Sequence, residues 1–84
     1  MEIREVWSIS PERIADFLLS SGGVLHEDAN AYCFNGCTVR VTVLPNGSIG
    51  RYSIPRTQVC FTGKDAETEK LHRAFFARFV SAGG

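Results

Sequence analysis

The stretch AYCFNGCTVRVTVLPNGSIGRYSI (residues 31–54) alternates apolar and polar side chains and contains the dipeptide Asn-Gly twice. Alternation with a period of two is typical of a strand covered on one face, and Asn-Gly is the strongest short hairpin signal. Turns at Asn35-Gly36 and Asn46-Gly47 would divide the segment into three antiparallel strands. Pro45 cannot donate a ladder hydrogen bond, so the second loop can open to four residues without changing the pairing.

The two turns fix a strand register that can be checked against itself. Around the first turn, Tyr32 is predicted to lie opposite Val39. Around the second turn, Val41 is predicted opposite Tyr52 and Val39 opposite Ile54, which gives one apolar and one mostly polar face. The apolar face carries Tyr32, Phe34, Cys37, Val39, Val41, Val43, Tyr52 and Ile54. The polar face carries Ala31, Cys33, Thr38, Arg40, Thr42, Arg51 and Ser53.

Two helices and further strands complete the predicted fold. Ser10 and Pro11 are typical of a helix start, and Gly22 ends that helix. The other predicted elements are strands over residues 2–9, 23–27 and 56–63 and a last helix over 66–82, capped by Thr62 or Asp65. We expect a single α+β domain over residues 1–84, a two-layer sandwich in the order β-α-β-β-β(-β)-α. Two helices would lie on the apolar face of an antiparallel sheet of four or five strands.

This element order is similar to that of one repeat of the TATA-binding protein fold and, more loosely, to that of helix-grip folds. The likeness is one of element order alone, so it implies no function. The sequence contains no internal repeat, linker or low-complexity stretch that would indicate a second unit.

Composition and charge disfavour several classes of function. Nine basic and nine acidic residues cancel, so the chain has no general electrostatic attraction for nucleic acids or anionic membranes. Apolar residues make up 44% of the chain, but no apolar run is long enough to span a bilayer. The first residues lack the apolar stretch of a signal peptide, and three cysteines are an odd number for a disulfide-stapled domain. We therefore expect a cytoplasmic protein.

The chain ends in Gly83-Gly84, which has two interpretations. Ubiquitin-like sulfur carriers are activated at a terminal Gly-Gly that leaves a strand as a mobile arm, and those domains begin with a hairpin followed by a helix. Here the first helix precedes the first hairpin signal, and the Gly-Gly follows a predicted helix directly. Because glycine is favoured just past a helix end, we prefer a helix stop. An activated tail stays the alternative, and the sequence does not show whether the tail is modified.

The residues that could carry chemistry do not form a motif. Cys33 and Cys37 point to opposite faces in the predicted register, so we expect neither a disulfide nor a zinc site between them. His26 lies beside a predicted turn, and His72 lies within the apolar arc of the last helix, where a structural histidine is the commoner case. A catalytic role for His72 would need a partner such as Glu27. No phosphate loop, nucleophile elbow or metal cluster is present, so we expect no catalytic residue, cofactor or metal, although the roles of His26, His72 and Cys33 stay open.

Three groups of residues are candidates for binding. The polar face could bind carboxylates or phosphates of a partner through Arg40, Thr42, Arg51, Ser53 and Arg56. This face lacks the aromatic platform of single-strand RNA binders, so nucleic acid is not an expected partner. A pocket between sheet and helices would be lined by His72, Tyr32 and Tyr52. Phe76 and Val80 lie toward the edge of the last helix and form a candidate dimer face.

Two classes of function follow from these groups. We favour a non-catalytic interaction or regulatory module that binds a protein partner, or self-associates as a homodimer, through its open sheet face or its last helix. The alternative is a small enzyme or ligand-binding domain with a pocket between sheet and helices. The absence of catalytic motifs and the predicted filling of the core by large side chains favour the first class.

Overall fold

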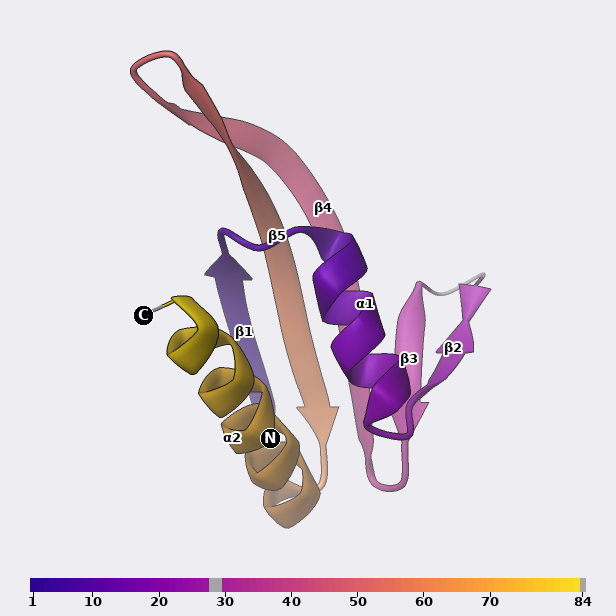
Figure 1. The fold of residues 1–84 in the computed structure, drawn as a ribbon. Coiled ribbons are helices and arrows are strands. Elements are labelled where there is room, and N and C mark those ends of the chain that lie inside the picture. Colours follow the sequence, from indigo (N-terminus) through magenta and orange to yellow (C-terminus); the bar gives the residue numbers. More distant parts are fainter. Residues whose placement is uncertain (28–29, 84) are drawn as a thin grey trace.

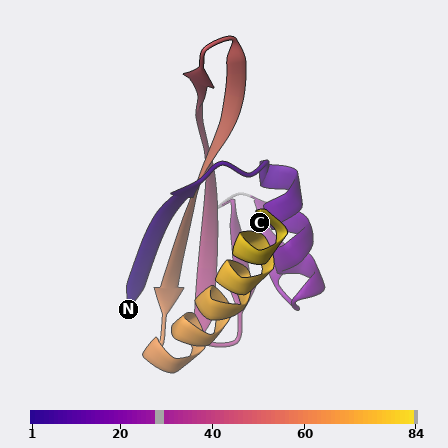
Figure 2. The same cartoon turned by 60° about the vertical axis from the view of Figure 1, so that its left-hand side comes forward.

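The computed structural model describes residues 1–27 and 30–83 of the chain, and the fold is the predicted two-layer α+β sandwich (Figure 1). The elements in chain order are β1 (Glu2–Trp7), α1 (Pro11–Ser20), β2 (Val24–His26), β3 (Ala31–Phe34), β4 (Cys37–Ile49), β5 (Tyr52–Gly63) and α2 (Asp65–Gly83). The five strands form one sheet in the order β1-β5-β4-β3-β2, and every neighbouring pair is antiparallel. Both helices lie on the same face of this sheet in two views (Figures 1 and 2), as the sequence predicted.

Helix α1 begins and ends where the local sequence directs. The Ser10 side chain accepts a hydrogen bond from the Arg13 backbone N–H at 3.4 Å, and Pro11 occupies the first helical position. Gly22, with φ of +101°, follows the helix end in a conformation that glycine adopts without steric cost. Ile14 and Leu18, one turn apart, are fully buried against the sheet.

The core lies between the two helices and the middle of the sheet. Phe61 and Val59 on β5, Val39 on β4 and Phe75 on α2 are all fully buried. The Phe75 ring packs edge-on against Phe61, with 5.4 Å between ring centroids, and similarly against the rings of Trp7 and Phe17. Aromatic packing around one central ring therefore fixes α2 on the sheet.

The first predicted turn is confirmed. Strands β3 and β4 pair with Phe34 opposite Cys37 and Tyr32 opposite Val39, which is the register that Asn35-Gly36 predicted. Gly36 has a φ of +88°, as a tight hairpin turn of this kind requires.

The second predicted turn is wrong. Strand β4 continues through Asn46-Gly47 to Ile49, and the chain reverses at Gly50-Arg51 instead. Val41 therefore lies opposite Val59 rather than Tyr52. The predicted pairing of Val39 with Ile54 is also replaced, because Val39 lies opposite Phe61.

A β-bulge explains why Pro45 and Asn46 do not end the strand. The register jumps from Leu44 opposite Arg56 to Gly47 opposite Ile54, so two residues of β4 face the single residue Pro55. Both prolines thus sit where the ladder is already interrupted, and their missing N–H groups cost no ladder hydrogen bond. The sequence analysis separated the third strand of residues 31–54 from the strand over residues 56–63, and this separation is wrong, because β5 continues through Pro55.

The longer hairpin forms an arm (residues 43–56) that extends beyond both helices (Figures 1 and 2). Tyr52 is 76% exposed and Val43 is 63% exposed, so their predicted place on a helix-covered face is wrong. Ile54 is only half-buried on the same arm. Val39, Val41, Tyr32 and Cys37 are buried as predicted.

Candidate functional site

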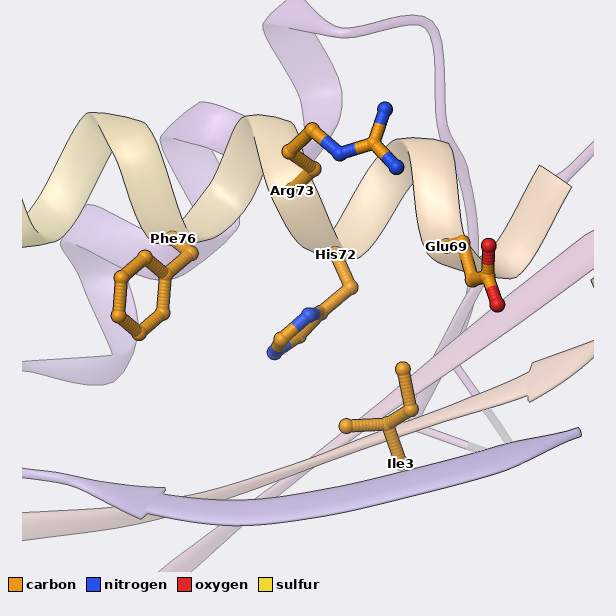
Figure 3. Close-up of a pocket in the computed structure, with 5 residues that line it drawn as sticks. All are labelled: Ile3, Glu69, His72, Arg73 and Phe76. Atoms are coloured by element: carbon orange, nitrogen blue, oxygen red, sulfur yellow. The ribbon is translucent and has the colours of Figure 1, made fainter. Parts of the chain in front are cut away.

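A shallow groove of about 330 Å³ runs between the edge strand β1 and helix α2 (Figure 3). Its lining residues are Ile3, Glu69, His72, Arg73 and Phe76. The four helix residues follow i, i+3, i+4, i+7 spacing, which places them on one side of α2. Ile3 comes from the face of β1 that the helices cover, so the groove has an apolar floor and charged lips (Figure 3).

His72 is fixed by a carboxylate at the back of this groove. The Oε1 atom of Glu5 lies 2.9 Å from Nε2 of His72 and accepts a hydrogen bond from the Trp7 indole N–H at 3.1 Å. The His72 ring also packs edge-on against Phe61, with 5.3 Å between ring centroids. One carboxylate oxygen therefore connects β1 to α2, and both side chains are mostly shielded, with 22% and 32% of their surfaces exposed.

Glu5 was not predicted as a partner for His72, for which the sequence suggested Glu27. Glu5 shares its strand face with Ile3 and Trp7, two apolar residues at the same period of two, and this alternation was the available signal. A carboxylate on an otherwise apolar strand face needs a hydrogen-bond donor, and His72 and Trp7 both supply one.

A histidine beside a carboxylate has the geometry of a general base. The groove, however, is lined by one aliphatic, one aromatic and three charged or polar side chains, and none of them is a serine, threonine or cysteine nucleophile. The Glu5–His72 contact joins β1 to α2 as a polar anchor.

The structure does not assemble the predicted pocket. Tyr32 is 7% exposed within the core, whereas Tyr52 stands on the arm, so Tyr52 does not lie with His72. A different hollow, of about 460 Å³, opens where the first hairpin meets α2, and Phe34, Cys37 and Leu71 lie on its wall.

Cys37, on the wall of this hollow, has a thiol whose pKa is shifted by its surroundings. Burial raises the pKa of the Cys37 thiol above its ordinary value of 9.0, against smaller opposing effects of the Thr68 hydroxyl and the Thr62 backbone. The Thr68 hydroxyl is fully buried, and no group in residues 1–27 and 30–83 lies in hydrogen-bond geometry with it. Burial therefore favours the protonated form of the Cys37 thiol, which is less nucleophilic than the thiolate.

The predicted arginine surface is divided between the sheet and the arm. Arg40 and Thr42 lie on the open face of the sheet, opposite Cys60 and Gln58 of β5. Arg51, Ser53 and Arg56 lie on the arm, where the Ser53 hydroxyl accepts a hydrogen bond from the Asn46 side-chain amide at 2.8 Å.

All three arginines are exposed. None of the ion pairs within the described part of the chain involves Arg40, Arg51 or Arg56. Their guanidinium groups are therefore available to carboxylates of another molecule.

Large apolar side chains are exposed on the arm as well. Ile49 is 67% exposed and lies directly opposite Tyr52, and Val43 is exposed at the base of the arm. On α2, the candidate dimer residues Phe76 and Val80 are 46% and 44% exposed, as the helical arc predicted.

Two further observations concern metals and membranes. All three cysteines are free thiols, and the described residues contain no cluster of His, Cys, Asp or Glu that could hold a metal ion. Within the same residues, neither helix has the combination of length and apolar character that crossing a bilayer requires.

These features define a small α+β protein with an antiparallel sheet that is open on one face and a hairpin arm beyond its core. The model of the family described as archaeal MoaD-like protein matches residues 2–84. The chain therefore belongs to this family of archaeal MoaD-like proteins. A search of curated proteins finds no match to the chain.

Proposed function

We propose that this MoaD-like chain is a non-catalytic interaction module that binds a protein partner through its arm and the adjoining open face of the sheet. The single observation that carries the proposal is the exposure of Ile49 and Tyr52, which lie opposite each other on an arm that no helix covers. Neighbouring exposed apolar side chains of this kind often mark interaction sites, because monomeric proteins rarely expose large contiguous apolar patches.

The charges around the arm suit a partner with an apolar strip and acidic flanks. Arg51 and Arg56 lie on the arm itself, and Arg40 adds a third positive charge on the open face of the sheet. Arginine is favoured at interfaces because its planar guanidinium can form two hydrogen bonds with one carboxylate. The proposal includes the expected cytoplasmic location, which the three free thiols support.

The test compares partner capture by the wild type with capture by an arm variant. In the double variant Ile49→Ser/Tyr52→Ser, both changes are at exposed sites, so the fold should be retained. We expect at least one protein from the native host lysate to lose about tenfold in quantitative yield, which corresponds to about 1.4 kcal/mol of binding free energy. The matched control is Leu19→Ser, an exposed apolar residue on α1, which lies on the opposite side of the sheet from its open face. Equal capture by all three proteins would contradict the proposal.

A second candidate function is that of a sulfur carrier activated at Gly84. Two observations favour it: the chain belongs to a MoaD-like family, and it ends in Gly-Gly. Two features weigh against it. Helix α2 continues through Gly83, and the fold begins with a strand and a helix rather than with the hairpin that precedes the helix in ubiquitin-like carriers.

The sulfur-carrier function predicts a covalent change at the C-terminus. Incubation with an activating enzyme and ATP should give a defined mass shift for an adenylate, and then a thiocarboxylate once a sulfur donor is added. The variant that lacks Gly84 is the control and should give neither product. An unchanged mass under conditions that activate a known carrier would exclude this function.

A further inference from the structure

The free edge of strand β1 has a defined set of hydrogen-bonding groups. Met1 and Gly63 exchange two hydrogen bonds across the β1–β5 pair, at 3.0 and 3.2 Å, so Ile3 and Glu5 also direct their backbone groups toward β5. The backbone N–H and C=O groups of the alternate residues, Glu2, Arg4 and Val6, therefore point to the open edge. None of the hydrogen bonds outside the helices and strands in the described chain involves these three residues.

Apolar surface lies directly beside this edge. Ile3 forms the floor of the groove, and Phe76 on its α2 side is 46% exposed. An open strand edge next to an uncovered apolar groove is the arrangement that accepts an added strand, because new ladder hydrogen bonds and side-chain burial are gained together.

We infer that the occupant of this edge is the β1 strand of a second copy of this chain, paired antiparallel about a two-fold axis. This inference goes beyond the proposed function, because it uses the edge strand and the groove rather than the arm. A two-fold pairing brings the same strand to itself, so its charges must be self-complementary.

The charges of β1 select one register out of three. The residues whose backbone groups point to the open edge are Glu2, Arg4 and Val6. In three two-fold registers, at least two of these residues form hydrogen-bonded pairs with the β1 strand of the second copy. One of them puts Arg4 directly opposite Arg4 of the second copy, and another puts Glu5 opposite Glu5, and like charges in these positions are destabilising.

The third register pairs unlike charges. It places Arg4 opposite Glu2 of the second copy, Glu2 opposite Arg4, and Ile3 opposite Ile3. Arg4 and Glu2 already lie 3.3 Å apart within one chain, so each arginine would lie between two carboxylates. The Ile3 pair would fall on the helix-covered side of the sheet, where it extends the apolar floor of the groove across the axis.

Charge reversal on the full-length protein tests this register. Sedimentation velocity over a concentration series should show a reversible dimer for the wild type. Arg4→Glu or Glu2→Arg alone should raise the dissociation constant about tenfold or more, and the double swap Glu2→Arg/Arg4→Glu should restore it to within about threefold. Arg51→Glu, an exposed charge reversal on the arm, is the matched control and should leave the dimer unchanged.

Three outcomes would overturn the inference. A wild type that stays monomeric up to about 1 mM would show that no second copy binds with useful affinity, which would leave the edge to an extended segment of another protein. A double swap that fails to restore association, or an arm control that weakens it as much as Arg4→Glu does, would exclude this register.

A crosslink provides a second measurement that does not depend on charge. In the selected register Ile3 lies on the two-fold axis in a close, non-hydrogen-bonded pair, where the Cα separation suits a disulfide. In a Cys33→Ser/Cys60→Ser background, Ile3→Cys should form a covalent dimer under mild oxidation, whereas the control Val6→Cys should not. The reverse pattern, or no crosslink for Ile3→Cys, would contradict the inference.

Discussion

The two halves of the β4–β5 hairpin have the same alternating sequence pattern but lie in different surroundings. Beneath the helices, Val39 and Phe61 are fully buried opposite each other. On the arm, Ile49 and Tyr52 also lie opposite each other, yet they are 67% and 76% exposed. Tyr52 and Phe61 are nine residues apart on β5, so their side chains point to opposite faces of the ribbon, and the helices cover only the face of Phe61. A period of two therefore specifies a strand, whereas the register and the cover of the helices decide which apolar residues become core.

Removal of a central ring should show this difference at its largest. Phe75→Ala deletes the fully buried ring that contacts Trp7, Phe17 and Phe61, so we expect a loss of about 3–5 kcal/mol in the free energy of unfolding. Tyr52→Ala, at an exposed site, should change it by less than about 0.5 kcal/mol. Urea denaturation measures both, and similar losses for the two variants would contradict the division between core and arm.

Loss of the Glu5 carboxylate should have an intermediate effect. Glu5→Ala leaves the Trp7 indole N–H without its acceptor and His72 Nε2 without its partner in a mostly shielded position, at a cost of about 1–3 kcal/mol. Glu2→Ala on the same strand removes an exposed carboxylate and should cost less than about 0.5 kcal/mol. Chemical denaturation of the two variants measures this difference. Equal free energies of unfolding for Glu5→Ala and Glu2→Ala would mean that the contact between Glu5 and His72 does not stabilise the fold.

Alanine at two arm glycines should distinguish the observed turn from the predicted one. Gly50 has a φ of +60°, so Gly50→Ala should cost about 1 kcal/mol through the left-handed backbone. Gly47 lies within the strand, where an added Cβ would meet only the Arg56 side chain at 3.3 Å, so Gly47→Ala should cost a few tenths of a kcal/mol. The opposite order of losses in thermal or urea unfolding would place the turn at Asn46-Gly47.

The smallest predicted effect concerns the Cys37 thiol at alkaline pH. Because its pKa is raised above 9.0 in the folded state, the unfolded chain ionises first, and stability should fall as pH rises through about 9. Cys37→Ala should remove this part of the pH dependence in unfolding measured from pH 7 to 10. With iodoacetamide at pH 8, the half-buried Cys33 and Cys60 should react before the buried Cys37, and the reverse order would contradict its protected state.

Much of the fold could be predicted because local signals agreed with each other. Ser10, Pro11 and Gly22 marked the bounds of α1, and Asn35-Gly36 set the β3–β4 register. These signals depend on backbone conformations that few residues tolerate, so they hold in most tertiary settings.

The second turn could not be predicted from the same kind of signal. Asn46-Gly47 reads as a turn, but the bulge opposite Pro55 accommodates both prolines and lets β4 continue. The observed pairing places Val59 and Phe61 against Val41 and Val39 in the core, a long-range gain that no short window contains.

The candidate site was predictable only in part. Exposure of Phe76 and Val80 followed from the width of the helical arc, since α2 covers the sheet with one side only. The Glu5–His72 contact joins residues 67 positions apart, and it depends on β1 pairing with β5 at the edge of the sheet. No local signal in the chain indicates that strand order.

The central claim is the long β4–β5 register, since the core and the arm both depend on it. The β1–β5 hydrogen bonds make Val41 and Val59 a non-hydrogen-bonded pair, in which the two Hα atoms come close. A two-dimensional NOE spectrum of the protein in D2O should therefore show an Hα–Hα cross-peak between Val41 and Val59. A cross-peak between Val41 and Tyr52 in its place would show a turn at Asn46-Gly47 and would contradict the account.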